Sequence, residues 1–233
     1  PSVVAGHSLG EYAALVAAGV LTLAQAAPLV RFRAQAMQQA VPVGAGAMAA
    51  ILGMDAAKVI AHCAAITQDF GLNSAEVVEA VNFNDPMQPV IAGSKAAVEK
   101  ACEVLKAAGA KRALPLPVSA PFHSSLMKPA AEALRGKLVD VELAAPRIPV
   151  LNNVDVVVES DPLRIRDALV RQAASPVRWV ESVQALKALG VEAVIECGPG
   201  KVLAGMTKRI LPDMAAASIY DPATLAAAQQ LVA

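Results

Sequence analysis

The chain has 233 residues, of which 56% are hydrophobic and only 3% aromatic, and its twenty basic side chains balance twenty acidic ones. Neither sign of charge forms a long block, and no apolar run approaches the roughly 20 residues that cross a bilayer, so the composition argues against a nucleic-acid-binding or membrane protein. The three cysteines, Cys63, Cys102 and Cys197, are odd in number and lack CxxC spacing, which favours buried thiols in a reducing, cytoplasmic setting over a disulfide framework or a zinc site.

The apolar residues are mostly alanine, valine and leucine, which is typical of a helix-rich α/β protein whose strands are buried on both faces. A short apolar strand at 3–6 leads through a turn into a helix over 12–18, which Gly19 is suited to end. Thr22 is expected to cap a second helix, which carries Arg31 and Arg33 and ends before Pro42.

Residues 44–117 are predicted to form a small domain of their own. The expected order is a strand at 47–52, a helix at 55–66, strands at 77–83 and 89–92, a helix at 95–108 and a strand at 111–116. Asp55 and Ser94 are the expected helix caps, and Asn84-Asp85-Pro86 the turn between the middle strands. The order βαββαβ predicts a ferredoxin-like unit, inserted into an α/β body formed by 1–43 and 118–233.

The remainder of the body alternates between helices and strands. Helices are expected at 125–139, 163–173, 177–189 and 202–210, strands at 148–151, 191–196 and 217–220, and an alanine-rich helix at the C-terminus. Gly198-Pro199-Gly200-Lys201 fails the spacing of a phosphate-binding loop, so we expect it to be a structural turn between strand and helix.

Ser8 lies where a nucleophile elbow would place it. Gly6-His7-Ser8-Leu9-Gly10 fits G-x-S-x-G between a strand and a helix, and the turn exposes the serine hydroxyl above the sheet. We expect glycine at both flanks because a Cβ there would clash with neighbouring backbone. The Leu9 amide, at the positive end of the following helix, is the expected oxyanion donor, and His7 is expected to project away as a supporting residue.

His123 is the best candidate for a base, because the chain has only three histidines. His7 adjoins the nucleophile, and His62 falls on a helix of the small domain and is expected to be structural. His123 occupies the loop Ser119-Ala120-Pro121-Phe122-His123-Ser124, where an imidazole has few structural reasons to be. No histidine follows it, which argues against a lipase or esterase with its base near the C-terminus.

Together, the Gly6–Glu11 motif, Ala120-Pro121-Phe122-His123 and the inserted unit resemble the malonyl-CoA:acyl carrier protein transacylases, a plan shared with acyltransferase domains of polyketide synthases. The similarity runs from Ser2 to the C-terminus and includes Val81-Asn82-Phe83-Asn84, Asn152-Asn153-Val154-Asp155 and Gly198-Pro199-Gly200-Lys201. The resemblance implies an α/β-hydrolase-like parallel-sheet body with a ferredoxin-like insertion. The family's N-terminal segment, which supplies a second oxyanion donor, is not in this sequence, so we expect the chain by itself to be poorly active.

The resemblance also implies roles for individual residues. Ser8 would carry the acyl ester with His123 as its base, and the backbone carbonyl at Gln172 would orient the imidazole in place of a carboxylate. Arg33 would bind the malonyl carboxylate through its planar guanidinium. Asn82, Asn84 and Phe122 would contact the substrate, and Leu9 and Phe122 favour malonyl over methylmalonyl.

The implied reaction transfers malonyl from coenzyme A to the phosphopantetheine thiol of acyl carrier protein in two steps, with no metal and no bound cofactor. Three alternatives remain at this level. The chain could be an acyltransferase domain of a polyketide synthase, a serine thioesterase or esterase, or a catalytically inactive interaction domain.

Overall fold

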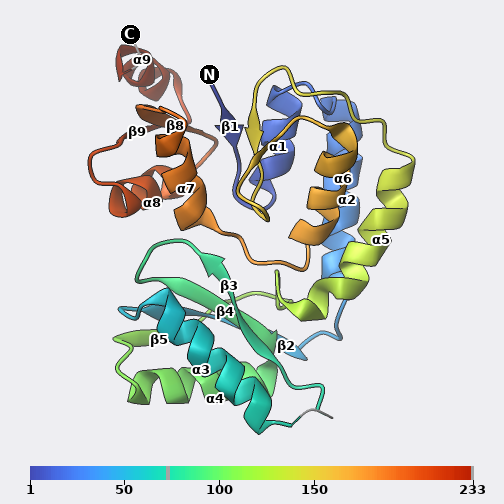
Figure 1. Cartoon of the computed structure of the whole chain (residues 1–233), viewed down its shortest axis with the longest axis vertical. Helices are drawn as coiled ribbons and strands as arrows, with labels where there is room; N and C mark the ends of the chain where they lie inside the picture. Colours follow the sequence, from blue (N-terminus) through green and yellow to red (C-terminus); the bar gives the residue numbers. More distant parts are fainter. Residues whose placement is uncertain (72–73, 232–233) are drawn as a thin grey trace.

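The computed structural model describes residues 1–71 and 74–231, and it has a mixed α/β architecture with two parts (Figure 1). A four-stranded sheet with two helices forms the lower part in Figure 1. The remaining elements form the larger part above it, which contains both chain termini. No helix in the described residues is long and apolar enough to span a bilayer.

The lower part is an antiparallel sheet in the order β3 (Val78–Phe83), β4 (Pro89–Ser94), β2 (Gly46–Leu52), β5 (Arg112–Pro115). Helices α3 (Ala56–Asp69) and α4 (Lys95–Ala107) cover one face, where Ile51 and Ile91 are fully buried. The opposite face carries Met48 and Val90, which pack with Phe122 of the larger part. Side chains alternate across each strand, so this sheet is buried on both faces.

Of the two helix caps expected in this part, one is present and one is not. Asp55 caps α3, because its carboxylate accepts hydrogen bonds from the amides of Ala57 (2.9 Å) and Lys58 (3.4 Å). Ser94 stands at the N-cap of α4 but makes no capping bond. Its hydroxyl instead donates to Glu76 and accepts from the Val77 amide, so it holds the segment that leads into β3.

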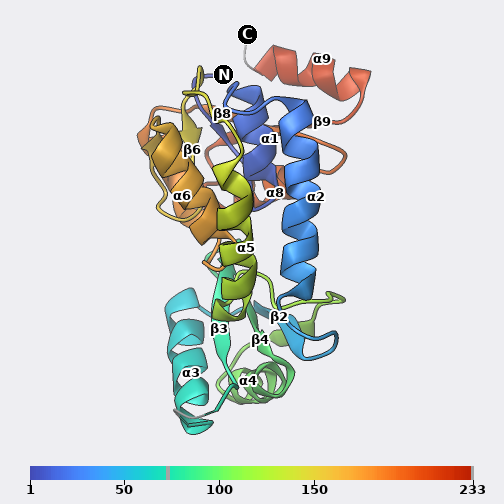
Figure 2. The same ribbon diagram turned by 90° about the vertical axis from the view of Figure 1, so that its right-hand side faces the viewer.

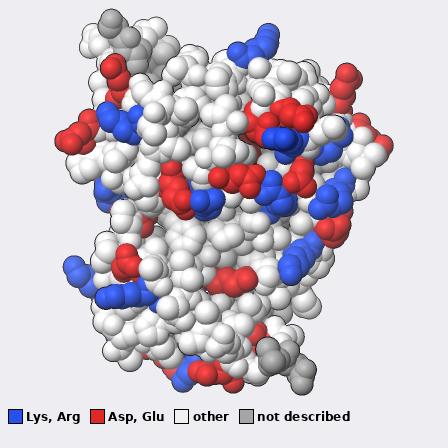
Figure 3. Space-filling view, in the orientation of Figure 1, with Lys and Arg blue, Asp and Glu red and all other residues white. Residues whose placement is uncertain are grey.

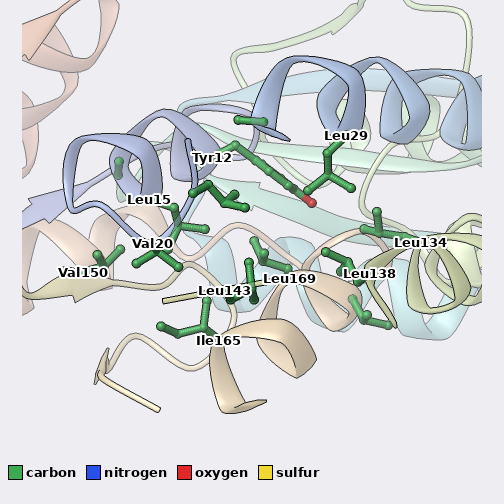
Figure 4. Packing of buried hydrophobic residues seen from close by; sticks show 14 of the residues in the cluster. Tyr12, Leu15, Val20, Leu29, Leu134, Leu138, Leu143, Val150, Ile165 and Leu169 are labelled. Atoms are coloured by element: carbon green, nitrogen blue, oxygen red, sulfur yellow. The ribbon is translucent and has the colours of Figure 1, made fainter. Parts of the chain in front are cut away.

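Four helices enclose the core of the larger part: α1 (Gly10–Ala17), α2 (Leu23–Gln39), α5 (Lys128–Val139) and α6 (Pro162–Gln172). Their facing sides contribute Tyr12, Leu29, Leu134 and Leu169 to one buried cluster (Figure 4). Thr22 begins α2 with a capping box that pairs it reciprocally with Gln25. Helices α2 and α5 run side by side toward the lower sheet (Figure 2), and a short 3₁₀ turn, η1 (Ser125–Met127), precedes α5.

The strands of the larger part differ from the expected parallel sheet in two respects. Strand β1 (Val4–Ala5) pairs in parallel with β6 (Val150–Leu151), but β6 then pairs antiparallel with β7 (Val158–Glu159), which we had not expected. A short connection between β6 and β7 permits only the antiparallel arrangement. In addition, β8 (Ala193–Cys197) and β9 (Ala215–Ile219) form a separate parallel pair.

Three more helices belong to this region: α7 (Trp179–Ala188), α8 (Val202–Ile210) and α9 (Pro222–Leu231). Helices α8 and α9 pack against β9, and α7 packs against α8. The expected helix start at 177 was wrong. Val177 is extended and exchanges backbone hydrogen bonds with Val81 and Phe83 of β3, which joins the lower sheet to the larger part.

The three cysteines are all free, but only Cys63 is fully buried; Cys102 is half-buried and Cys197 exposed. The expectation of buried thiols was therefore correct for Cys63 alone. Charges of both signs are interspersed over the face shown in Figure 3.

Candidate active site

Ser8 occupies a strained turn between β1 and α1. Its φ is +51°, a left-handed conformation that non-glycine residues adopt rarely. A Cβ on Gly6 would lie 2.0 Å from the carbonyl carbon and oxygen of Gly10, so glycine is required at that position. A Cβ on Gly10 would meet nothing within 4 Å, so the expected steric need for glycine at position 10 was wrong. Only the residue at position 6 must therefore lack a Cβ.

Asn153 fixes this turn from a distant part of the chain. Its Oδ1 accepts a hydrogen bond from the Ser8 amide (2.7 Å), and its Nδ2 donates to the Gly6 carbonyl (2.8 Å). The side chain follows β6, whose parallel pairing with β1 carries it beside the elbow, and it is completely buried. Sequence reasoning included Asn153 only within a motif and assigned it no task.

The Ser8 hydroxyl and the His123 imidazole meet, although 115 positions separate them: Ser8 Oγ lies 2.7 Å from His123 Nε2. His123 Nδ1 lies 3.0 Å from the Gln172 carbonyl oxygen, which can only accept a hydrogen bond. Nδ1 therefore carries the proton, and the lone pair of Nε2 faces the serine. His123 also has a positive φ, +67°, so both partners are held in unusual backbone conformations.

Burial keeps this imidazole neutral. Desolvation, with a further contribution from the nearby Arg33 charge, lowers the pKa of His123 to about 3. A neutral imidazole with a free Nε2 lone pair is the form that can accept a proton from a hydroxyl.

Arg33 points at the same hydroxyl from α2. Its Nη2 donates to Ser8 Oγ (3.0 Å) and to Gln172 Oε1 (2.9 Å), and its guanidinium lies 5.6 Å from the centre of the Tyr12 ring. The side chain is only 6% exposed, and Nε has no partner within the described residues. Arg31, two residues earlier on the same helix, is exposed. Arg33 is thus a buried cation with donor capacity to spare beside the serine.

Gln172 contacts all three of these groups. Its carbonyl accepts from His123, its side-chain oxygen accepts from Arg33, and its Nε2 donates to the Ser8 carbonyl (3.1 Å). We had expected only the carbonyl contact. The side-chain contacts could not be foreseen, because the end of α6 and the elbow are brought together only by tertiary packing.

A buried carboxylate, Glu11, completes the network. Its Oε2 accepts from Gln172 Nε2 (2.8 Å) and from the Asn153 amide (3.0 Å). Burial raises the pKa of Glu11 to about 7, and those two hydrogen bonds and the Arg33 charge oppose the rise. Sequence reasoning assigned no role to Glu11, although it directly follows the glycine of the elbow motif.

The remaining expected site residues lie around this centre. Asn84 Oδ1 accepts from His7 Nε2 (2.8 Å), and the His7 ring lies 5.4 Å from that of Trp179, so His7 is the supporting residue we expected. Asn82 is buried in β3, and its Oδ1 lacks a partner within the described residues. Phe122 packs between the two parts of the molecule.

The Leu9 amide is free to bind a ligand. The next three amides, at 10–12, bond the carbonyls of His7, Ser8 and Leu9, whereas no acceptor within the described residues takes the Leu9 N–H. The described residues contain no group of three or more histidines, cysteines or acids that could hold a metal.

Fold and site together define an α/β protein built around a serine–histidine pair on a strained elbow, with a buried arginine beside the serine. Residues 1–226 match the model of the acyl transferase domain, and the chain belongs to that family.

Similar proteins extend this assignment. The chain is 53% identical to the malonyl CoA-acyl carrier protein transacylase of Salmonella typhimurium over 98% of its own length and 72% of that protein. Among solved structures, it matches the acyl-carrier-protein S-malonyltransferase of Burkholderia pseudomallei with a TM-score of 0.94 and 64% identity, over 99% of this chain and 73% of the other. It also matches a malonyl-transacylase in complex with a type II PKS acyl-carrier protein, with a TM-score of 0.94 and 50% identity, over 99% of this chain and 73% of that one.

Proposed function

We infer that this chain transfers a malonyl group from malonyl-CoA to the phosphopantetheine thiol of acyl carrier protein, through an ester on Ser8. One observation carries the inference: Ser8 Oγ lies 2.7 Å from the neutral imidazole of His123 and 3.0 Å from the buried guanidinium of Arg33. The family match and the names of its relatives support the choice of acyl group and acceptor.

In the first half-reaction, Ser8 Oγ attacks the thioester carbonyl of malonyl-CoA while its proton passes to His123 Nε2. The Gln172 carbonyl stabilises the imidazolium that forms, because it already accepts from Nδ1 at 3.0 Å. The tetrahedral intermediate then collapses, the carbon–sulfur bond breaks, and the departing thiolate of coenzyme A takes the proton from His123. A malonyl-serine ester and neutral His123 remain.

The oxyanion of that intermediate needs donors that are already in position. The free Leu9 amide at the start of α1 is the proposed donor, and the partial positive charge of the helix terminus adds to it. Asn153 holds the Ser8 amide, so the direction of the neighbouring Leu9 N–H is fixed before substrate arrives.

The second half-reaction repeats this chemistry with the carrier's thiol as nucleophile. His123 takes the thiol proton, the thiolate attacks the serine ester, and the proton returns to Ser8 Oγ as the new thioester leaves. One base serves both halves, so the kinetics should be ping-pong. No cofactor takes part in this scheme.

Arg33 is the proposed determinant of the acyl group. A guanidinium forms two parallel, charge-assisted hydrogen bonds with a carboxylate, which malonyl has and acetyl lacks. Leu9 and Phe122 favour malonyl over a branched acyl group, and Asn82 and Asn84 are proposed to contact the substrate. The unpartnered Oδ1 of Asn82 supports that role.

We also propose the finer description of the fold and its setting. Residues 44–117 form the ferredoxin-like unit, supported by the element order βαββαβ and by the sheet order β3-β4-β2-β5. Residues 1–43 and 118–233 form the α/β-hydrolase-like body. The three free cysteines support a reducing, cytoplasmic setting.

The same chemistry would serve a polyketide pathway as well as fatty acid synthesis, and one similar solved structure is a malonyl-transacylase in complex with a type II PKS acyl-carrier protein. A transfer assay with malonyl-CoA and a phosphopantetheinylated carrier tests the proposal. We expect malonyl-carrier to form faster than free malonate. Release of malonate at the same rate or faster would instead identify a thioesterase, and consumption of malonyl-CoA no faster than by Ser8→Ala would indicate an inactive domain.

A further inference from the structure

Glu11 is a buried acid that the proposed reaction does not use. It lies in the first turn of α1, three residues after the nucleophile, and is 2% exposed. No Lys or Arg within the described residues forms an ion pair with it. Burying a carboxylate without an ion pair destabilises the folded protein, and the two hydrogen bonds to Glu11 Oε2 offset only part of that cost.

One oxygen of Glu11, together with the Ser8 carbonyl, fixes the direction of the Gln172 amide, and the Glu11 contact is the shorter of the two. A carboxylate can only accept hydrogen bonds and a guanidinium can only donate them. Gln172 lies between the two, with Nε2 2.8 Å from Glu11 Oε2 and Oε1 2.9 Å from Arg33 Nη2. The amide therefore has one satisfactory orientation, and a reversal would set two donors against each other at Arg33.

The orientation of Gln172 in turn holds Arg33. The Gln172 Oε1 is one of two acceptors bonded to Nη2, and the other is Ser8 Oγ, which the acyl transfer itself must engage. Gln172 Oε1 is thus the contact that can keep the guanidinium in place while the serine reacts. Glu11 acts on Arg33 indirectly. Its carboxylate bonds the nitrogen of the Gln172 side chain, and the oxygen of the same side chain bonds the Arg33 guanidinium.

We propose that Glu11 is a positioning residue that sets malonyl preference by fixing the Gln172 amide and, through it, the Arg33 guanidinium. The inference rests on the proposed malonyl transfer and deepens it. It differs from a purely structural role, because a structural role would affect all acyl substrates alike.

The charged and titratable groups facing Glu11 are few. Arg33 faces it from α2, Tyr12 from its own helix, and Asp155 from the connection between β6 and β7. Burial is the largest influence and raises the pKa of Glu11 to about 7. When the carboxylate gains a proton it becomes a donor as well, so Glu11 no longer holds the Gln172 amide and only the Arg33 guanidinium and the Ser8 carbonyl still do.

The test compares kcat/KM for malonyl-CoA and acetyl-CoA in the wild-type protein, Glu11→Ala, Glu11→Gln and the exposed control Glu132→Gln. Glu11→Ala should lower the malonyl-to-acetyl ratio roughly tenfold to hundredfold, mainly through KM for malonyl-CoA, as expected when a hydrogen bond to a charged group is lost. Glu11→Gln, which keeps an acceptor oxygen, should restore part of the ratio, and the control should match wild type.

A pH series makes the test independent of whether Glu11→Ala folds. In wild type the malonyl-to-acetyl ratio should fall as the pH drops through about 7, whereas in Glu11→Gln it should stay flat. Equal losses on both substrates, or an unchanged ratio with the same pH dependence in Glu11→Gln, would overturn the inference. Wild-type protein that transfers malonyl no faster than Ser8→Ala would instead refute the proposed function.

Discussion

Replacing Arg33 with alanine is the sharpest probe of acyl-group choice. The guanidinium is 6% exposed and lies 3.0 Å from the reacting hydroxyl, and its Nε has no partner within the described residues. A malonyl carboxylate would supply acceptors for that spare donor capacity. Arg33→Ala removes those contacts and leaves the carboxylate without a partner in a buried site.

The size of the effect follows from the geometry. Two charge-assisted hydrogen bonds in a buried site contribute about 3 kcal/mol or more. At about 1.4 kcal/mol per factor of ten, kcat/KM for malonyl-CoA should fall by roughly 150-fold or more. Acetyl-CoA carries no carboxylate, so its kcat/KM should change by less than about tenfold, through loss of the contact with Ser8 Oγ.

Steady-state kinetics with both thioesters would measure this difference. Arg31→Ala is the matched control, because Arg31 lies on the same helix two residues away and is exposed. Arg31→Ala should behave as wild type. Equal losses on malonyl-CoA and acetyl-CoA in Arg33→Ala would refute the assignment of Arg33 to the carboxylate and leave it only a role in holding Ser8.

Three further predictions concern the elbow and its titrating groups. Gly6→Ala would place a Cβ 2.0 Å from the Gly10 carbonyl and should lower the free energy of unfolding by about 3 kcal/mol or more. Gly10→Ala, with open space at that point, should be neutral or stabilising. Denaturant titration followed by the fluorescence of Trp179, the only tryptophan, would measure both, and equal effects would contradict the geometry. Asn153→Ala should cost about 2–3 kcal/mol of stability, because it leaves the buried Ser8 amide and Gly6 carbonyl unpaired, and it should also slow acylation. A variant as active as wild type would show that the turn at Ser8 keeps its conformation without Asn153. The pKa of His123 is lowered in the folded protein, so acid protonates the unfolded chain first, and the contribution of His123 to stability is complete above pH 6.5 and is lost as the pH falls toward about 3. The raised pKa of Glu11 acts in the opposite direction between pH 4.5 and about 7, because the folded protein then binds the proton more tightly. The unfolding free energy of Glu11→Gln should therefore fall more steeply with acid than that of wild type, and parallel pH curves would contradict this.

Local signals in the sequence were sufficient to predict much of this molecule. The turn at Ser8 could be foreseen because glycines, an apolar strand and a helix surround it, and the structure has a strained serine there. The order of elements in the lower sheet followed from alternating apolar residues and capping side chains such as Asp55. His123 could be selected because the chain offers so few histidines.

Tertiary packing determined what the sequence could not indicate. The contacts of Asn153 with Ser8 and of Gln172 with Glu11 join residues more than 140 positions apart. Nothing local marks these side chains, because an asparagine in a loop and a glutamine at a helix end are usually solvated. The extended segment at Val177 was mistaken for helix, since its pairing partner in β3 lies far away in the chain.

The central claim is that the Ser8 hydroxyl receives the malonyl group with His123 as base. Peptide mapping by mass spectrometry after incubation with malonyl-CoA tests it directly in wild type, Ser8→Ala and His123→Ala. We predict a malonyl ester on the Ser8 peptide of wild type, none in Ser8→Ala, and slow, sparse labelling in His123→Ala. A malonyl group on another residue, or undiminished labelling of Ser8→Ala, would contradict the account.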